Sequence, residues 1–280
     1  MQQGQPSRTA LGAAFHRAAH QVLERGVIFA DPLAGRILVA DFERAVREAE
    51  GEPSRRRLRL FVAARARFAE DAAAAAVAGG VRQLVVLGAG LDTYAYRAAP
   101  LDGLRVFEVD HPVTQAWKRR RLADAAIAVP RSLAFVPVDF ERDTLAGGLA
   151  AAGFDPARRT FFTWLGVVPY LTEQAVFSTL GFIAGLPGGA HAVFDYSNPP
   201  DPRPGQGGSA DRETLAARVA SLGEPFASFL ETDALLARLR ALGFREVEDL
   251  GPELIRRRYF AGRGGPLPDR GGHVVRASTA

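Results

Sequence analysis

The chain has 280 residues, of which 48% are hydrophobic, and a formal net charge of +4 at pH 7. This composition excludes disorder throughout and provides enough apolar material for a sizeable core. The absence of cysteine excludes disulfides, thiolate metal sites and cysteine nucleophiles, and we expect no metal site. The basic residues are mostly interleaved with acidic ones, so we expect no nucleic-acid partner.

No apolar run reaches the length of a membrane span, because the Ala-rich stretch at 72–78 is too short and too weakly apolar. The first ten residues lack the basic and apolar regions of a signal peptide. These features predict a cytoplasmic protein without a membrane partner. They leave its oligomeric state open.

Residues 1–80 are predicted to form a helical extension. The segments with an amphipathic, Ala-rich pattern are Thr9–Glu24, Leu33–Glu48 and Leu58–Ala78. Asp31-Pro32 and Glu52-Pro53 separate these segments, because a residue before proline is driven out of the helical region of backbone space.

From residue 81 onward, short apolar runs alternate with helical stretches. The runs are Gln83–Leu87, Leu104–Val109, Ala134–Val138, Thr160–Trp164, Ala190–Phe194, Glu246–Glu248 and His273–Ala277. Such alternation predicts an α/β core over 81–280, with a mostly parallel sheet and helices on both faces. We expect one structural domain overall, with the helical extension as its cap.

Two segments rich in proline or glycine, 197–209 and 262–272, interrupt this alternation and are predicted to be loops. The first would follow a strand and lie near the strand ends. We therefore expect it to cover a substrate bound there.

A glycine turn follows the first apolar run, in the segment LVVLGAGLDTYAYR at residues 84–97. Gly88 and Gly90 allow a backbone to approach a ligand without interference from a Cβ atom. Ligands of open α/β sheets bind at the carboxyl ends of the strands. A dinucleotide fingerprint would need glycine at the position of Thr93, which disfavours a nicotinamide-dependent oxidoreductase.

Acidic residues stand at the ends of the next two runs. Asp110 lies 20 residues after Gly90, where a carboxylate accepts hydrogen bonds from ribose hydroxyls in dinucleotide folds. Asp139 and Phe140 suit an adenine pocket, with the carboxylate for the amine and the ring for the base. Helix capping is the alternative for both aspartates. Glu108, on the same side of the strand as Asp110, is a weaker candidate for the same pocket.

Long motifs in the chain resemble the bacterial branch of the leucine carboxyl methyltransferase family. They include LVVLGAGLDTYAYR, VFEVDHPVTQAWKRRRL, FVPVDFERD, TWLGVVPYLTEQAV, SRTALGAAFHRA and FADPLAGRIL. The resemblance covers most of the chain. It implies a Rossmann-like class I methyltransferase fold, S-adenosylmethionine (SAM) as cofactor, and methylation of a carboxyl or hydroxyl oxygen of a small molecule.

The resemblance also implies roles by position. Asp110 matches the ribose-binding acid, and Asp139 with Phe140 matches the pair at the adenine. Gly88 and Gly90 match the turn under the methionine part of SAM.

Four further positions follow from the resemblance. Arg65 matches an arginine that reaches the SAM carboxylate, which a guanidinium binds in a bidentate fork; an exposed helix arginine is the alternative. Leu165 replaces a glutamate that contacts the cofactor region in many members. Asp92 and Arg97 belong to the signature and are predicted either to serve the site or to form an ion pair within the loop.

Methyl transfer from SAM is an in-line displacement that depends on positioning and exclusion of water. A carboxylate acceptor needs no general base, whereas a hydroxyl acceptor is helped by one. The catalytic candidates are His111, Tyr170, Arg258 and Tyr259, with Arg256 and Arg257 as further candidates for the acceptor pocket. The alternative for His111 is orientation of the loop, and the alternative for Tyr170 is packing at a helix start. For residues 256–259 the alternative is a surface charge run. A noncatalytic SAM-binding module stays open because Leu165 replaces an acid.

Overall fold

The computed structural model describes residues 7–97, 103–139, 142–199, 226–260 and 271–280, and only these are discussed below. The strands are β1 (Gln83–Leu87), β2 (Arg105–Asp110), β3 (Leu133–Pro137), β4 (Thr160–Trp164), β5 (Ala190–Ser197), β6 (Glu246–Leu250) and β7 (Gly272–Ser278). The α-helices are α1 (Arg8–Leu23), α2 (Phe42–Gly51), α3 (Arg56–Ala78), α4 (Tyr94–Arg97), α5 (Pro112–Asp124), α6 (Leu145–Ala151), α7 (Glu173–Ala184), α9 (Thr232–Ala241) and α10 (Pro252–Ile255). Shorter helical stretches are η1 (Arg36–Asp41), η2 (Pro53–Arg55), η3 (Val168–Tyr170) and η4 (Arg256–Phe260).

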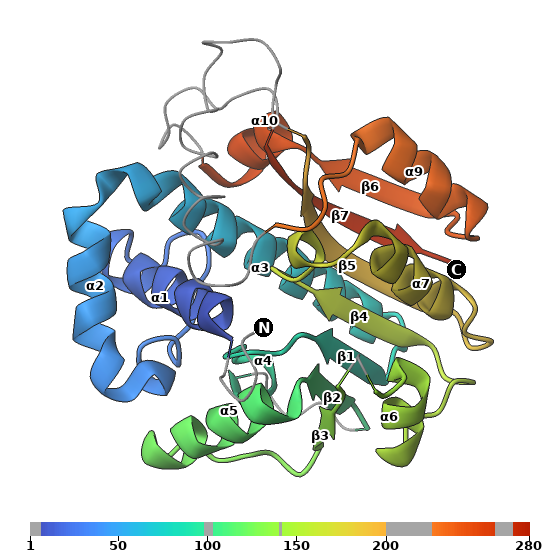
Figure 1. The fold of residues 1–280 in the computed structure, drawn as a ribbon, viewed down its shortest axis with the longest axis horizontal. Helices are drawn as coiled ribbons and strands as arrows, with labels where there is room; N and C mark the ends of the chain where they lie inside the picture. Colours follow the sequence, from blue (N-terminus) through green and yellow to red (C-terminus); the bar gives the residue numbers. More distant parts are fainter. Residues whose placement is uncertain (1–6, 98–102, 140–141, 200–225, 261–270) are drawn as a thin grey trace.

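The strands form one sheet with the order β3-β2-β1-β4-β5-β7-β6 (Figure 1). Neighbours from β3 to β5 are parallel, whereas β7 runs antiparallel to both β5 and β6. The predicted mostly parallel sheet is thereby confirmed. The strand order reverses between β1 and β4, and such a switch point opens a crevice at the carboxyl ends of the strands.

Both faces of the sheet are buried, as the continuous apolar runs require. In β1, Val85 and Leu87 belong to the same hydrophobic cluster as residues of α6, α7 and α9, whereas Leu84 and Val86 belong to a second cluster with residues of α3 and α10. Each fully buried side chain of this size contributes about 1.5–3 kcal/mol. The predicted helices on both faces are confirmed.

The amino-terminal helices pack on one another and on the sheet. Helix α1 contacts α2 and α3, and α3 also contacts β4, β5 and β7 (Figure 1). The expectation of one continuous helix over Leu33–Glu48 is wrong. Val39 adopts a φ of 52° and a ψ of −122°, which are not helical, so the segment divides into η1 and α2. The last helix of the predicted extension shares a hydrophobic core with the sheet.

The two predicted loops lie mostly outside the described residues. Ser197 still belongs to β5, and Gly272 already belongs to β7. The predicted cover over the substrate is therefore not described by the structure. Among the described helices, none is long and apolar enough to cross a membrane.

Candidate functional site

A cavity of about 430 Å³ lies at the carboxyl ends of β1, β2 and β4. This volume is within the range of small-molecule sites. The described lining combines the glycine turn after β1, the tip of β2, the turn after β4, and residues of α1 and α3. Of the predicted site residues, the lining contains Arg65, Gly88, Gly90, Asp92, Arg97, Asp110, Leu165 and Tyr170.

Two segments close tightly around the glycine turn. Gly88 and Gly90 have φ values of +64° and +42°. A Cβ atom on Gly88 would lie 2.4 Å from Cγ2 of Val167, and one on Gly90 would lie 2.9 Å from Cβ of Ala10. The turn thus needs glycine for its backbone conformation and for the approach of α1 and the β4 turn.

Gly88→Ala is expected to destabilise the chain by about 1–2 kcal/mol through backbone strain alone, with a further cost from the contact with Val167. Urea unfolding measures this loss. Adding Val167→Ala should restore part of the stability but not all of it, because the strained φ persists. Gly12→Ala is the control, since nothing lies within 4 Å of its added Cβ. Equal free energies of unfolding for Gly88→Ala and Gly12→Ala would contradict this account.

Asp110 joins the tip of β2 to the glycine turn. Its Oδ2 accepts a hydrogen bond from the backbone N–H of Gly90 at 2.5 Å, and its Oδ1 accepts one from His111 N–H at 2.7 Å. Burial raises the pKa of the Asp110 carboxyl. His111 caps α5, because its Nδ1 accepts from Val113 N–H at 3.2 Å, and it is absent from the described cavity lining. The loop-orienting alternative for His111 agrees with this geometry.

Arg65 is held at the cavity by a residue that the sequence did not reveal. Its Nη1 donates to Oδ2 of Asp195 at 2.7 Å, and Oδ1 of Asp195 accepts from Gly166 N–H at 2.6 Å. Arg67, two residues on, instead pairs at the surface with Asp71. Arg65 is therefore not a solvent-exposed helix arginine. The one signal for Asp195 was an acid near the carboxyl end of a buried strand.

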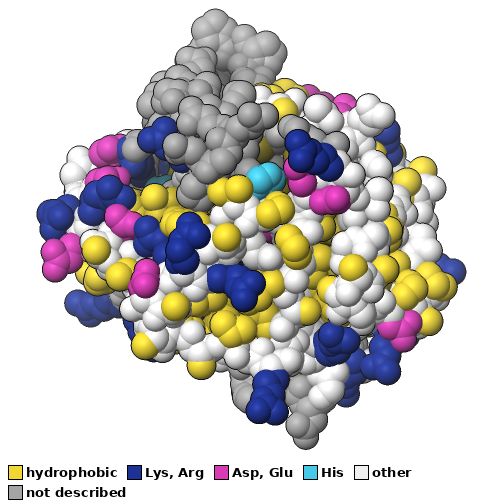
Figure 2. Space-filling view, turned by 60° about the horizontal axis from the view of Figure 1, so that its bottom comes forward, with side chains coloured by type: hydrophobic (Ala, Val, Ile, Leu, Met, Phe, Trp, Pro, Cys, Tyr) yellow, Lys and Arg dark blue, Asp and Glu magenta, His cyan; other side chains and the backbone are white. Residues whose placement is uncertain are grey.

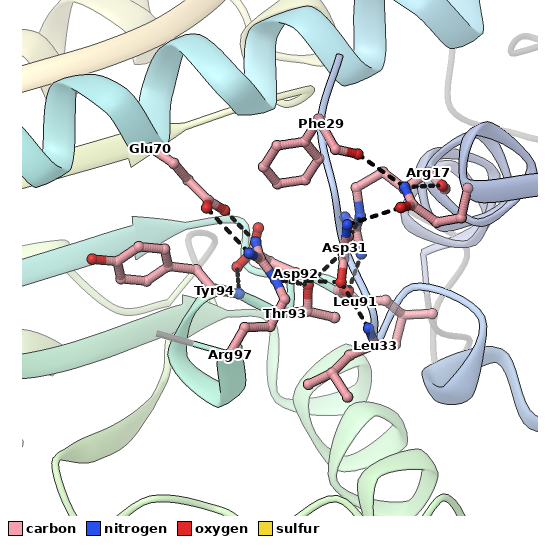
Figure 3. A network of polar contacts seen from close by, with 11 residues as sticks. Arg17, Phe29, Asp31, Leu33, Glu70, Leu91, Asp92, Thr93, Tyr94 and Arg97 are labelled. Carbon is pink, nitrogen blue, oxygen red and sulfur yellow. Dashed lines mark hydrogen bonds and ion pairs between the residues drawn. The ribbon is translucent and has the colours of Figure 1, made fainter. Parts of the chain in front are cut away.

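A second buried acid, Asp31, connects the amino-terminal segment to the loop after β1 (Figure 3). It accepts hydrogen bonds from Thr93 Oγ1 at 2.6 Å and from Leu33 N–H at 3.0 Å. The Nε atoms of Arg17 and Arg97 each lie 3.3 Å from its carboxylate. Sequence reasoning treated this aspartate only as a helix boundary before proline.

The same network shows the interactions of Asp92 and Arg97, the two charged residues of the family signature (Figure 3). Arg97 donates to Thr93 at 2.9 Å and also pairs with Glu70 of α3. Asp92 Oδ1 accepts from Tyr94 N–H at 2.8 Å. The structure thus pairs Arg97 with Glu70 and Asp31 rather than with the predicted Asp92. Through these pairs, Arg97 connects the loop to α3 and to the amino-terminal segment.

Glu108 lies in a buried cluster rather than in the described cavity lining. Its carboxylate is 2.8 Å from Nζ of Lys118 and accepts from the Tyr96 hydroxyl at 3.0 Å. Burial raises the pKa of the Glu108 carboxyl. Because Glu108 is buried beside Lys118 and does not border the described cavity, the structure does not support it as a second ligand-binding acid.

Tyr170 is the catalytic candidate that the described lining contains, and its ring lies 5.4 Å from that of Phe226. The described lining does not include Arg258 or Tyr259. Arg258 pairs with Glu248 at 3.1 Å. Arg256 and Arg257 likewise form exposed pairs, both with Glu253. On the face of the molecule shown in Figure 2, separate basic groups are interspersed with acidic ones.

The structure describes the predicted adenine pair only in part. Asp139 lies outside the described lining, and its carboxylate is 3.8 Å from Nε of the exposed Arg142. Phe140 lies outside the described residues. Their assignment to adenine stays a prediction.

The chain is similar to known proteins over most of its length. Residues 10–184 match the family described as leucine carboxyl methyltransferase. YktD of Bacillus subtilis, provisionally named an S-adenosyl-L-methionine-dependent methyltransferase, is 31% identical over 290 residues, covering 94% of each chain. SCO7813 of Streptomyces coelicolor, provisionally named in the same way, is 34% identical and covers 79% of this chain and 89% of its own.

A crystal structure of a DUF574 family protein from Streptomyces avermitilis has a similar fold. Its TM-score is 0.51 at 15% sequence identity, and the match covers 95% of this chain and 97% of the other. The likeness concerns the fold alone. The match over residues 10–184 and the similarity to these relatives show that the chain belongs to the leucine carboxyl methyltransferase family.

Proposed function

We propose that this chain is a SAM-dependent methyltransferase that methylates a carboxyl or hydroxyl oxygen of a small molecule. One observation carries the proposal. A single cavity joins the Arg65 guanidinium, which Asp195 holds, with the half-buried Asp110 carboxylate, which accepts from Gly90 N–H. SAM presents a carboxylate at its methionine end and two hydroxyls on its ribose, and these groups match Arg65 and Asp110.

The remaining cofactor-binding roles rest on the family resemblance, and three of these residues also line the cavity. Gly88 and Gly90 provide the turn beneath the methionine part of SAM, and Leu165 borders the site without adding a polar contact. Asp139 and Phe140 are assigned to the adenine on the family resemblance.

When bound, SAM supplies a methyl carbon that its sulfonium makes electrophilic. The chain has to position the acceptor oxygen in line and exclude water. Tyr170 is assigned to acceptor positioning because it lines the cavity with an aromatic ring and a hydroxyl group. A carboxylate acceptor is already ionised at neutral pH and needs no general base.

Calorimetric titration with SAM, its demethylated product S-adenosylhomocysteine (SAH), NAD and NADP tests this proposal. We expect SAM and SAH to bind and both nicotinamide cofactors to fail. Binding of NAD without SAM would indicate an oxidoreductase instead. Transfer of a radiolabelled methyl group to carboxylate or phenol acceptors would distinguish an enzyme from a noncatalytic SAM-binding module.

A further inference from the structure

We propose that Asp195 is a positioning residue for the methionine end of SAM, acting through Arg65 without contacting SAM. The proposal rests on the proposed function, because it needs SAM in the cavity. Asp195 belongs to β5 and is 3% exposed, and it is absent from the described lining, whereas Arg65 is part of that lining.

A single carboxylate orients two components of the site. Oδ2 of Asp195 accepts from Arg65 at 2.7 Å, and Oδ1 accepts from the backbone N–H of Gly166 at 2.6 Å. The arginine side chain and the turn after β4 are thus fixed relative to each other. Since a guanidinium has five N–H donors, the bond to Asp195 leaves others for a ligand carboxylate.

The guanidinium of Arg65 lies against Gly166 and near the ring of Phe61. A Cβ atom on Gly166 would lie 2.6 Å from Nη2 and 3.2 Å from Cζ of Arg65, so the guanidinium lies directly against the glycine backbone. The Phe61 ring lies 5.7 Å from Cζ on the same helix. Without Asp195, the guanidinium would lose the charge-assisted bond that selects this position.

A positioning role for Asp195 predicts a selective change in ligand affinity, whereas a purely structural role does not. Asp195 acts on the part of the ligand that Arg65 binds, so its loss should weaken only ligands that carry the amino-acid carboxylate. SAH carries that group, whereas 5′-methylthioadenosine has the same nucleoside without it. Comparing the two ligands isolates the effect of Asp195.

The experiment measures dissociation constants of SAH and 5′-methylthioadenosine for Asp195→Asn by calorimetry. We expect a roughly tenfold weaker binding of SAH, as for loss of one charge-assisted hydrogen bond, with 5′-methylthioadenosine unchanged. Arg65→Ala should be equally selective, and adding Asp195→Asn to it should cost no further affinity for SAH. Asp249→Asn is the matched control: this carboxylate pairs with His273 at 2.8 Å on the same sheet and should alter neither ligand.

Equal weakening of both ligands, or no change in either, would overturn the role of Asp195 while leaving the proposed function intact. A wild-type chain that binds neither ligand would contradict the proposed function itself, and the Asp195 proposal with it. If Asp195→Asn fails to fold, Gly166→Ala places a Cβ atom 2.6 Å from Nη2 of Arg65, which displaces the guanidinium from an otherwise unaltered Asp195. This second variant should show the same selective loss of SAH, and an unchanged ratio of the two affinities would reject the proposal.

Discussion

Asp31→Ala is expected to lower the free energy of unfolding by about 3–5 kcal/mol, as removal of one partner from a buried ion pair does. The carboxylate of Asp31 is 1% exposed and lies between the guanidinium groups of Arg17 and Arg97. Its removal leaves part of their charge uncompensated. It also deprives Thr93 O–H and Leu33 N–H of their acceptor.

Urea unfolding monitored by circular dichroism measures this loss. The control is Asp71→Ala, because Asp71 pairs with Arg67 at 2.8 Å but its side chain is 45% exposed. A surface pair of this kind contributes at most about 1 kcal/mol. If the two variants were equally stable, the Asp31 network would not hold the amino-terminal segment to the loop after β1.

Asp110→Ala is expected to weaken SAH binding roughly 10- to 150-fold, which corresponds to about 1.5–3 kcal/mol for hydrogen bonds to a charged group. The variant removes the proposed acceptor for the ribose hydroxyls and the acceptor for Gly90 N–H. Calorimetry on a variant shown to be folded measures the dissociation constant. An unchanged constant would refute the ribose assignment.

The binding of SAH should also depend on pH through Asp110. Burial raises the pKa of this carboxyl, so its protonated form appears at a higher pH than for an exposed aspartate. Protonation turns one of the carboxylate oxygens from an acceptor into a donor, so affinity is expected to fall as the pH is lowered. Asp110→Asn should bind weakly without this added dependence, and it thereby corrects for the ionisation of the ligand itself. An identical pH profile in the two proteins would contradict the mechanism.

The positions of Gly88, Gly90 and Asp110 were predictable from the chain because all three lie within three residues of the end of an apolar run. In parallel strands the carboxyl ends meet at one edge of the sheet, so local patterns suffice to bring these residues together. Arg65 was predicted from the family resemblance alone. Nothing local distinguishes it from Arg67, its neighbour on the same helix.

The break at Val39 shows the limit of a periodic pattern. The apolar spacing over 33–48 favours one helix, yet the backbone leaves the helical region at Val39 and the segment divides into η1 and α2. Ile37 and Leu38, before the break, and Ala45, after it, reach the same hydrophobic cluster. Tertiary packing here overrides the local preference.

The sequence by itself determined the strands, the glycine turn, the acid at the tip of β2 and the family. These features depend on the spacing of apolar residues and on short motifs, which neighbouring residues specify. Only the tertiary structure decided which buried charges meet: Asp195 with Arg65, Asp31 with Arg17 and Arg97, and Glu108 with Lys118. Asp195 and Arg65 lie 130 residues apart, and they meet because α3 packs across β5. A buried charge must find a partner, but the packing of helices on the sheet decides which partner is within reach.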